Sequence, residues 1–464
     1  MTSKPNILLF FADDQRFDTI NALGNKKIHT PHLDKLVSTG TSFTHAHIPG
    51  GTCAAVCMPS RAMLLTGRGL FHIEREGQSI PEAHTMLGEC LKQEGYTTFG
   101  TGKWHNGKSS YARSFTEGDE IFFGGMGDHW NVPVYHFDPE GKYATQSPFI
   151  KEPMKTNAVE YQDCDHITVG KHSTELFVDA ALKFLSKRKS ENPFFMYVSL
   201  MAPHDPRTMP KQFLDMYDPS EVELPKSFCS GHAIDTGALK IRDELLAAFP
   251  RDPEEIKRHI AEYYAMITHL DDELGRLLQG LEDRHELENT IIVFSGDNGL
   301  AVGKHGLMGK QNLYDHSVRV PLLFAGPGIP KGEKTHSLAY LSDIFPTLCD
   351  MIKAEKPETV EGRSLLKSIN NSEFKTHDQL YLVYGNSIRG LSDSKFKLIE
   401  YASGPTQLFD LLEDPEELIN LAEQADKAIV LKDLKNRLIQ ERDKHDDLKH
   451  PTGEHFWKQR ADLN

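Results

Sequence analysis

Alternating strand and helix patterns constrain the fold of this chain more than any other feature of its sequence. Residues 6–12, NILLFFA, form an unbroken apolar run, which is typical of a parallel strand buried on both faces. Beyond it, helical periodicity and short apolar runs follow each other repeatedly. We predict helices at 31–39, 86–94, 173–187 and 253–281, and strands at 96–99, 194–200 and 290–295. The alternation predicts an α/β fold with a large, mostly parallel sheet flanked by helices.

The pattern changes after residue 375. Short strand candidates separated by tight turns are followed by a charged helix, at 379–384, 387–391, 396–401, 407–411 and 425–444. This pattern predicts a small α+β subdomain with an antiparallel sheet. We therefore expect two parts, a catalytic α/β domain at 1–375 and a C-terminal subdomain at 376–464. With 464 residues, 39% of them hydrophobic, the chain is long enough for both.

Composition narrows the class of protein. The formal net charge of −15 makes nucleic acid an unsuitable partner. Six cysteines are too sparse for a disulfide framework, and no apolar run is long enough to span a membrane. The first apolar run ends in two aspartates, which indicates a buried strand and not a signal peptide. The sequence as given predicts a cytoplasmic protein, or a periplasmic or secreted one if an export signal was removed.

Chemically active side chains follow four of the predicted strands, and in open α/β sheets ligands bind at the carboxyl ends of strands. These segments are Asp13-Asp14, Gly102-Lys103-Trp104-His105, Pro203-His204-Asp205 and Asp297-Asn298. Taken singly, an aspartate pair is more often a cap and a histidine more often a core residue. Their occurrence together at strand ends favours a functional site.

The acidic residues of this set offer only oxygen ligands, through Asp13, Asp14, Asp297 and Asn298. Oxygen ligands suit a hard cation such as Ca²⁺ or Mg²⁺, whereas zinc prefers histidine or cysteine. Three basic residues, Arg61, Lys103 and Lys310, add positive charge. With a bound dication, the site is expected to accept an anion although the protein as a whole is acidic.

The stretch 53–68, CAAVCMPSRAMLLTGR, places a cysteine at a predicted helix start. Pro59 suits the first turn of a helix, and Gly67 suits its end. Cys57 would then lie at a helix N-terminus, where the dipole and free N–H groups favour negative charge. Arg61, one turn later, points back to the same place. A buried structural cysteine would not need this setting.

These residues resemble type I, formylglycine-dependent sulfatases, a family of the alkaline-phosphatase-like superfamily. The resemblance covers nearly the whole chain and includes an N-terminal metal pair and motifs of the type C-x-P-S-R, GKWH, PH, SDNG, GK, RVP and YDL. The matching segments begin at Asp13, Cys57, Gly102, Pro203, Ser295, Gly309, Arg319 and Leu408. Asn106, Gly296 and His316-Ser317 depart from the family pattern, which bears on the subfamily and not on the reaction. The resemblance implies the alkaline-phosphatase-like fold.

The resemblance implies that the nucleophile is a modified residue and that a metal ion is bound beside it. A separate formylglycine-generating enzyme would oxidise Cys57 to formylglycine, and the aldehyde would hydrate to a diol. One hydroxyl would attack sulfur, and the other would remain to expel sulfate. The Ca²⁺ ion, with Mg²⁺ as the second choice, would be held by Asp13, Asp14, modified Cys57, Asp297 and Asn298.

The remaining catalytic roles also follow from the resemblance. Arg61 would orient the diol, and Lys103 and Lys310 would bind the sulfate oxygens. His105 would take the proton that lets sulfate leave. His204 would protonate the leaving alcohol, with Lys310 as a possible helper.

Substrate choice rests on weaker candidates. The loop 124–130, GGMGDHW, carries His129 and Trp130, and its tryptophan could stack on a sugar or cover the core. Asp205 and Arg207 could contact a sugar or form a surface ion pair. His305, in a loop before Lys310, could reach the leaving group.

We therefore expect hydrolysis of sulfate monoesters on a sulfated saccharide. The alternative is a phosphonate monoester or phosphodiester hydrolase of the same superfamily, whose substrates carry a similar charge. A calcium-binding, lectin-like protein is disfavoured because Lys103, His105, His204 and Lys310 are all present. A zinc phosphatase is disfavoured because the expected metal ligands contain no histidine.

Overall fold

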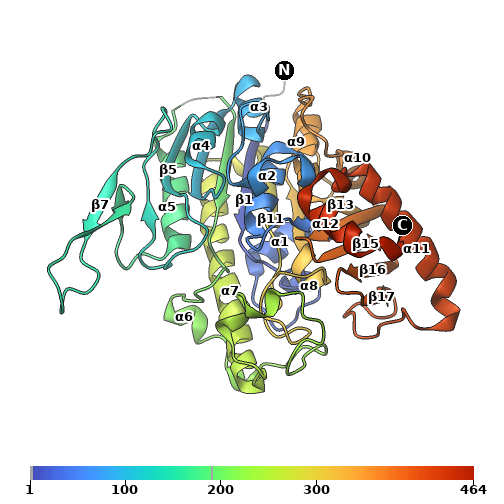
Figure 1. Ribbon diagram of the computed structural model, residues 1–464. Coiled ribbons are helices and arrows are strands. Elements are labelled where there is room, and N and C mark those ends of the chain that lie inside the picture. The colour runs from blue at the N-terminus through green and yellow to red at the C-terminus, as the bar shows by residue number, and fades with distance from the viewer. Residues whose placement is uncertain (1–3, 190–191, 464) are drawn as a thin grey trace.

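An eight-stranded sheet forms the centre of the protein in the computed structural model, which describes residues 4–189 and 192–463 (Figure 1). Strand β12 runs antiparallel to both of its neighbours, and the other neighbouring pairs of this sheet are parallel. In spatial order the strands are β13 (Glu333–Tyr340), β2 (Gly40–His47), β12 (Arg319–Ala325), β11 (Thr290–Gly296), β1 (Asn6–Ala12), β10 (Phe194–Ser199), β4 (Thr97–Lys103) and β5 (Glu117–Phe122). The predicted α/β class is confirmed.

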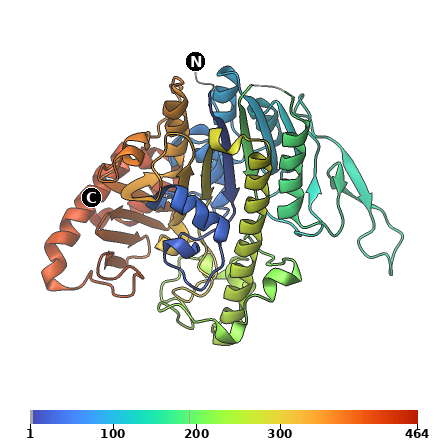
Figure 2. The same cartoon turned by 180° about the vertical axis from the view of Figure 1, so that it is seen from behind.

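The side chains of β1 alternate between two hydrophobic layers, which explains its unbroken apolar sequence. Leu8 and Phe10 pack with α1 (Pro31–Thr39), α5 (Ser173–Lys187) and α7 (Pro253–Asp283), the layer seen in Figure 2. The alternate residues, such as Leu9, pack on the opposite face with α2 (Cys57–Thr66), α3 (Leu87–Gln93), α4 (Lys108–Ser114) and α9 (Ile344–Ile352). Every residue of β1 is buried, as a strand between two helical layers requires.

A second, five-stranded sheet lies beside the β13 edge of the large sheet (Figure 1). Its strands are β17 (Thr406–Asp410), β16 (Phe396–Tyr401), β15 (Ile388–Asp393), β14 (Gln379–Tyr384) and β3 (Gly50–Gly51). The four C-terminal strands are antiparallel, as predicted, and are covered by α11 (Ala428–Lys444) and α12 (Pro451–Gln459). Strand β3 comes from the segment just before α2, so this sheet is joined to the helix that carries Cys57. The division of the chain at residue 375 stays a prediction.

Buried ion pairs attach the second sheet to the first. Lys397 of β16 contacts Asp315 of α8 (Asp315–Val318) and, at 2.7 Å, the Oε1 of Glu417. The backbone N–H of Asp315 donates to Glu417 Oε2 at 2.8 Å. Each charge therefore has a partner in a place that water does not reach, as buried charges need.

The remaining elements lie at the margins of the large sheet. A hairpin of β7 (Gln146–Phe149) and β8 (Glu160–Asp163) projects beyond β5, as Figure 1 shows. The others are β6 (Pro133–Val134), β9 (His166–Ile167), α6 (Lys211–Leu214) and α10 (Leu366–Asn370). In the part of the chain that the structure describes, helices that combine the length and apolar character needed to cross a membrane are absent.

Candidate functional site

The strand order brings the predicted strand-end residues together. Strands β11, β1, β10 and β4 are consecutive neighbours and parallel, so their carboxyl ends meet at one edge of the sheet. This edge carries Asp297 and Asn298 after β11, Asp13 and Asp14 after β1, His204 after β10, and Lys103 and His105 at the end of β4. Four sequence segments up to 284 residues apart, as from Asp14 to Asn298, thus form one site.

Three buried oxygen atoms in this site have no hydrogen-bond donor among the described residues. They are Oδ1 of Asp13, Oδ2 of Asp14 and Oδ1 of Asn298. The amide nitrogen of Asn298 donates to Asp14 Oδ1 at 2.6 Å and to the Gly299 carbonyl at 2.9 Å, which fixes Oδ1 as the free atom. Buried acceptors without donors are costly unless something positive fills the space between them.

A cation fits this set of atoms. Ligand atoms of Asp13, Cys57 and Asp297 all lie within 4.8 Å of one another, and the same holds for Asp13, Asp14 and His204. The unpartnered atoms are all oxygen, the ligand type of hard divalent cations. Asp13, Asp14, Asp297 and Asn298 could therefore hold a metal ion, with residue 57 at its side.

Cys57 is the first residue of α2 and is almost fully buried, with 3% of its surface exposed. Its Sγ lies 3.5 Å from Nδ1 of His105 and 3.7 Å from Nζ of Lys103. Burial raises the pKa of the thiol, although Lys103 and Lys310 act in the opposite direction. Ser60, in the same first turn, donates to the Asp297 carbonyl at 2.6 Å and so fixes the helix start against β11.

Arg61 contacts two carboxylates of the site. Its Nε donates to Asp297 Oδ2 at 2.8 Å, and its Nη2 lies 3.6 Å from Asp13 Oδ2. Its Nη1 donates to the Lys103 carbonyl at 3.2 Å and contacts the hydroxyl of Ser199. Arg61 thus ties Asp13 and Asp297 to the ends of β4 and β10, and its expected role in orienting a diol stays a prediction.

Two buried lysines contact the aspartates that follow β1. Lys103 contacts Asp13, and Nζ of Lys310 lies 2.5 Å from Asp14 Oδ1. Burial lowers the pKa of both lysines, but the neighbouring carboxylates outweigh it, so both pKa values are raised and both side chains are charged. With Arg61, three positive charges balance three carboxylates. A dication would leave an excess of positive charge, which suits an anionic ligand.

His105 stands beside Cys57 in a left-handed backbone conformation, with φ +67°. Burial, and then Lys103 and Arg61, hold the pKa of its imidazole well below the usual value, so the ring is neutral at neutral pH. The glycine-rich loop 124–130 covers this ring. A Cβ added at Gly125 would lie 2.7 Å from His105 Nε2, which explains the glycine there. A neutral, enclosed imidazole can accept a proton.

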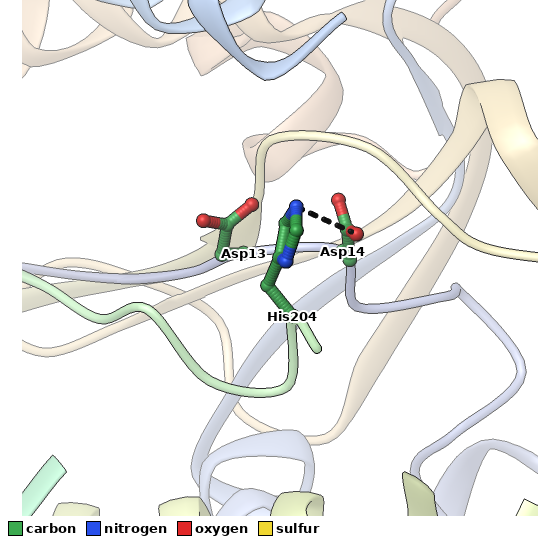
Figure 3. Close-up of side chains that lie close together, drawn as sticks. All are labelled: Asp13, Asp14 and His204. Atoms are coloured by element: carbon green, nitrogen blue, oxygen red, sulfur yellow. Dashed lines mark ion pairs between the residues drawn. The ribbon is translucent and has the colours of Figure 1, made fainter. Parts of the chain in front are cut away.

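His204 projects between Asp13 and Asp14 (Figure 3). Its Nδ1 donates to the Asp205 carbonyl at 2.7 Å, and its Nε2 lies 3.7 Å from Asp14 Oδ2. Because a carbonyl can only accept, Nδ1 carries a hydrogen, and any proton that the ring transfers must be at Nε2.

The five residues predicted to contact the substrate lie in different surroundings. His129 is fully buried, and both of its ring nitrogens are bonded within the protein, to Ser173 and to the His204 carbonyl, so a sugar contact has no support. Trp130 is partly exposed and lies edge-on to His172, with ring centroids 5.1 Å apart.

Asp205 and Arg207 belong to the loop 204–208 that carries His204. Asp205 forms an ion pair with Arg242, whose side chain is 45% exposed. Arg207 donates from Nη1 to His259 Nδ1 at 2.9 Å, while its buried Nε and Nη2 have no partner among the residues described. His305 instead stacks on Tyr314, with ring centroids 4.1 Å apart.

Sequence reasoning missed three residues that shape this site. Ser199, the last residue of β10, donates to the Lys103 carbonyl at 2.6 Å, and the strand-end rule could have found it. Asn106 donates to the Met58 carbonyl at 2.9 Å and so supports the start of α2. Arg242 lies in a long loop that contains no motif, so no local sequence pattern predicted it.

Family models match most of the chain. Residues 5–354 match the sulfatase family, and residues 303–444 match the C-terminal part of N-sulphoglucosamine sulphohydrolase. An arylsulfatase of Clostridium perfringens is 29% identical over 441 residues, covering 89% of this chain and 89% of that protein.

Solved structures show the same fold. One, in complex with its substrate D-glucosamine-2-N,6-O-disulfate, has a TM-score of 0.76 at 22% identity and covers 97% of this chain and 99% of that one. A phosphonate monoester hydrolase of Agrobacterium radiobacter has a TM-score of 0.74 at 22% identity, covering 95% and 96%. By the family match over residues 5–354, this chain belongs to the sulfatase family of sulfuric ester hydrolases.

Proposed function

We propose that the protein hydrolyses sulfate monoesters of a saccharide, through a formylglycine residue made from Cys57 and with a bound Ca²⁺ ion. The observation that carries the proposal is the meeting of Cys57, three unpartnered buried oxygens and two charged lysines at one sheet edge. The segment Cys57-Met58-Pro59-Ser60-Arg61 would be read by a formylglycine-generating enzyme during maturation. The hydrated aldehyde would supply the hydroxyl that attacks sulfur.

Calcium is preferred over zinc because the unpartnered donor atoms are all oxygen. Asp13, Asp14, Asp297, Asn298 and residue 57 would hold the ion. When bound, it would lower the pKa of the attacking hydroxyl and polarise the sulfate. Mg²⁺ is the second choice.

The chain's own cations would bind the sulfate. Lys103 and Lys310 are buried and charged, so they can hold two sulfate oxygens and stabilise the charge that develops on them. Arg61 would act through Asp13 and Asp297, by keeping these carboxylates and the start of α2 in place.

Two histidines would divide the proton transfers. The neutral ring of His105, 3.5 Å from Cys57, would accept the proton whose removal lets sulfate leave residue 57. His204 would protonate the saccharide oxygen from Nε2, because its Nδ1 hydrogen is engaged by the Asp205 carbonyl.

A saccharide is the favoured alcohol because polar groups surround His204. Asp205, Arg207 and Arg242 can bind hydroxyl groups of a sugar, and Trp130 offers a partly exposed ring at the side. The similar structure bound to a disulfated glucosamine supports the same substrate class.

Phosphonate monoester hydrolysis is the second candidate, favoured by the similarity to the Agrobacterium enzyme. Comparing kcat/KM for an aryl sulfate and an aryl phosphonate would decide between the two. A preference for the phosphonate would overturn the sulfatase proposal.

The role of His204 is tested by two leaving groups. A saccharide alcohol needs a proton when the S–O bond breaks, whereas nitrophenol needs little help. The His204→Ala variant should lose about 10²–10⁴-fold in kcat/KM on a saccharide sulfate and far less on nitrophenyl sulfate. The matched His105→Ala variant should lose activity equally on both. Equal losses for His204→Ala would remove it from the acid role and leave Lys310 as the candidate.

A further inference from the structure

Two buried histidines from different elements lie stacked behind the loop 204–208. His129 comes from the glycine-rich loop, and His172 directly precedes α5. Their ring centroids are 5.0 Å apart and the rings are nearly parallel, at 6°. Both side chains are fully buried. Neither ring contacts the atoms proposed to react, so any role of these histidines must come from their contacts with the loop 204–208.

Each ring donates a hydrogen bond to a carbonyl of this loop. Nε2 of His129 lies 3.0 Å from the carbonyl oxygen of His204, and Nε2 of His172 lies 2.9 Å from that of Thr208. Because carbonyl oxygens only accept, both Nε2 atoms must carry hydrogen. The loop is thus fastened at its first and last residues by a matched pair of imidazoles, which we call the histidine pair.

The other ring nitrogens fix the same tautomer. Nδ1 of His172 accepts from the backbone N–H of Thr174 at 3.3 Å, as the cap of α5, so it has no hydrogen. Nδ1 of His129 lies 2.7 Å from the Ser173 hydroxyl, which can donate to it. Burial lowers the pKa of His129 to about 4 and that of His172 to about 2, so both rings are neutral.

Further packing makes the histidine pair rigid. His269 of α7 packs on His172 with ring centroids 4.7 Å apart, and Phe213 stacks on His269 at 4.7 Å. The backbone N–H of Ser173 donates to the His129 carbonyl at 2.7 Å, which ties the glycine-rich loop to α5. The loop with His204 therefore rests on a layer of rings anchored in two long helices.

We propose that His129 and His172 are positioning residues that hold the loop 204–208, and with it the ring of His204, in place for proton transfer to the leaving group. The proposal rests on the acid role proposed for His204. A general acid works only within hydrogen-bond reach of the ester oxygen, and a displacement of about 1 Å can cost about 100-fold in rate.

The first test compares His129→Leu with His129→Gln. A glutamine amide can place its nitrogen close to where Nε2 of the ring lies, so it can still donate to the His204 carbonyl, whereas leucine cannot. The Leu variant should lose about 10–100-fold in kcat on a saccharide sulfate and little on nitrophenyl sulfate. The Gln variant should recover most of that loss. His377→Leu, at a partly buried histidine that pairs with Asp343 outside this loop, is the matched control.

The same change in a His204→Ala background separates positioning from general damage. If His129 acts through His204, His129→Leu should add no further loss on the saccharide sulfate there. Additive losses, or equal losses of His129→Leu on both substrates, would overturn the proposal.

A third measurement does not depend on activity. Hydrogen–deuterium exchange of the peptide 201–210 should quicken in His129→Leu and in His172→Leu, but not in His129→Gln or His377→Leu. Unchanged exchange in both leucine variants, at melting temperatures showing that they fold, would refute the positioning role. If His204→Ala lost activity equally on both substrates while this exchange still quickened, the acid role would fail and the clamping of the loop would stand.

Discussion

The residues on the cation side of the site, Asp13, Asp14, Asp297 and Asn298, follow strands directly. Those on the leaving-group side, the loop 204–208 and Arg242, lie in loops. On the cation side the sheet itself fixes part of the backbone. The N–H of Asp297, for example, donates to the carbonyl of Ala12, the last residue of β1, at 3.1 Å.

On the leaving-group side the backbone is fixed by side chains. The imidazoles of the histidine pair bond the two ends of the loop 204–208, and Asp205 of this loop forms an ion pair with Arg242. In the proposed mechanism, the residues that would hold the cation therefore lie directly at strand ends of the sheet. The part that must suit a particular alcohol sits on loops, which can change without disturbing the sheet.

The largest effect is expected from replacing Cys57, the proposed precursor of the nucleophile, which lies next to the cation side. Cys57→Ala cannot form the hydrated aldehyde and should lose turnover on the order of 10⁶-fold, the scale on which losing a nucleophile acts in other hydrolases. Cys53→Ala, four residues earlier, should stay active. Both are measured by kcat on nitrophenyl sulfate, after coexpression with a formylglycine-generating enzyme. Near-normal turnover of Cys57→Ala, or a Cys57 peptide that never shows the aldehyde mass, would exclude the mechanism.

The next largest effect is expected from removing the metal ion or one of its ligands, which changes the cation side and leaves the loops as they are. Chelation should abolish activity on both kinds of substrate, and Ca²⁺ should restore it. Asp297→Asn removes one ligand charge and should weaken Ca²⁺ binding by about tenfold or more, measured by calorimetry. Asp119→Asn, at a half-buried carboxylate outside the site, is the control. Stoichiometric zinc in the active protein as isolated would contradict the calcium assignment.

A smaller effect is expected on the leaving-group side. Arg242→Ala leaves Asp205 without its ion-pair partner and should raise KM for a saccharide sulfate about tenfold, or about 1.4 kcal/mol, with nitrophenyl sulfate unaffected. Arg258→Ala, at an exposed arginine of α7 that pairs with Glu255, should change neither KM. A similar rise in KM for both substrates would show that Arg242 serves the sulfate and would erase the proposed difference between the two sides.

The smallest expected effect concerns His72, which lies outside both sides of the site. A variant at His72 should change the stability of the protein and not its activity. Nδ1 of His72 lies 2.8 Å from Glu361 and Nε2 lies 3.2 Å from Asp446, and the bond to Glu361 raises the pKa of His72. Its protonated form therefore stabilises the fold below the unfolded pKa of about 6.5, and this stabilisation is lost as the pH rises through the folded pKa.

His72→Gln should lower the free energy of unfolding at about pH 5.5 by less than about 1 kcal/mol, and by still less at about pH 8.5, with kcat unchanged. Urea unfolding at the two pH values measures this difference, and exposed His455→Gln is the control. A larger loss at the higher pH would have the wrong sign for this ion pair.

Several elements could be predicted because their signals are local. The strand at 6–12 and the helix at 173–187 are found with the predicted bounds, since an apolar run and an amphipathic period are properties of the segment alone. Strands β2 and β12 were not predicted. The polar residues of β2, such as Thr44 and His45, give no strand pattern, and its strand conformation depends on pairing with β12 and β13.

The family, the strand-end residues and the helix that begins near Cys57 could be predicted because each depends on residue types at short, fixed spacing. Three features of the site are visible only in the folded protein. Arg61 contacts Asp13 and Asp297, Gly125 leaves room for the ring of His105, and the histidine pair bonds the loop of His204. These contacts join residues tens to hundreds of positions apart. They depend on how loops pack over the sheet edge, which no local pattern in the chain encodes.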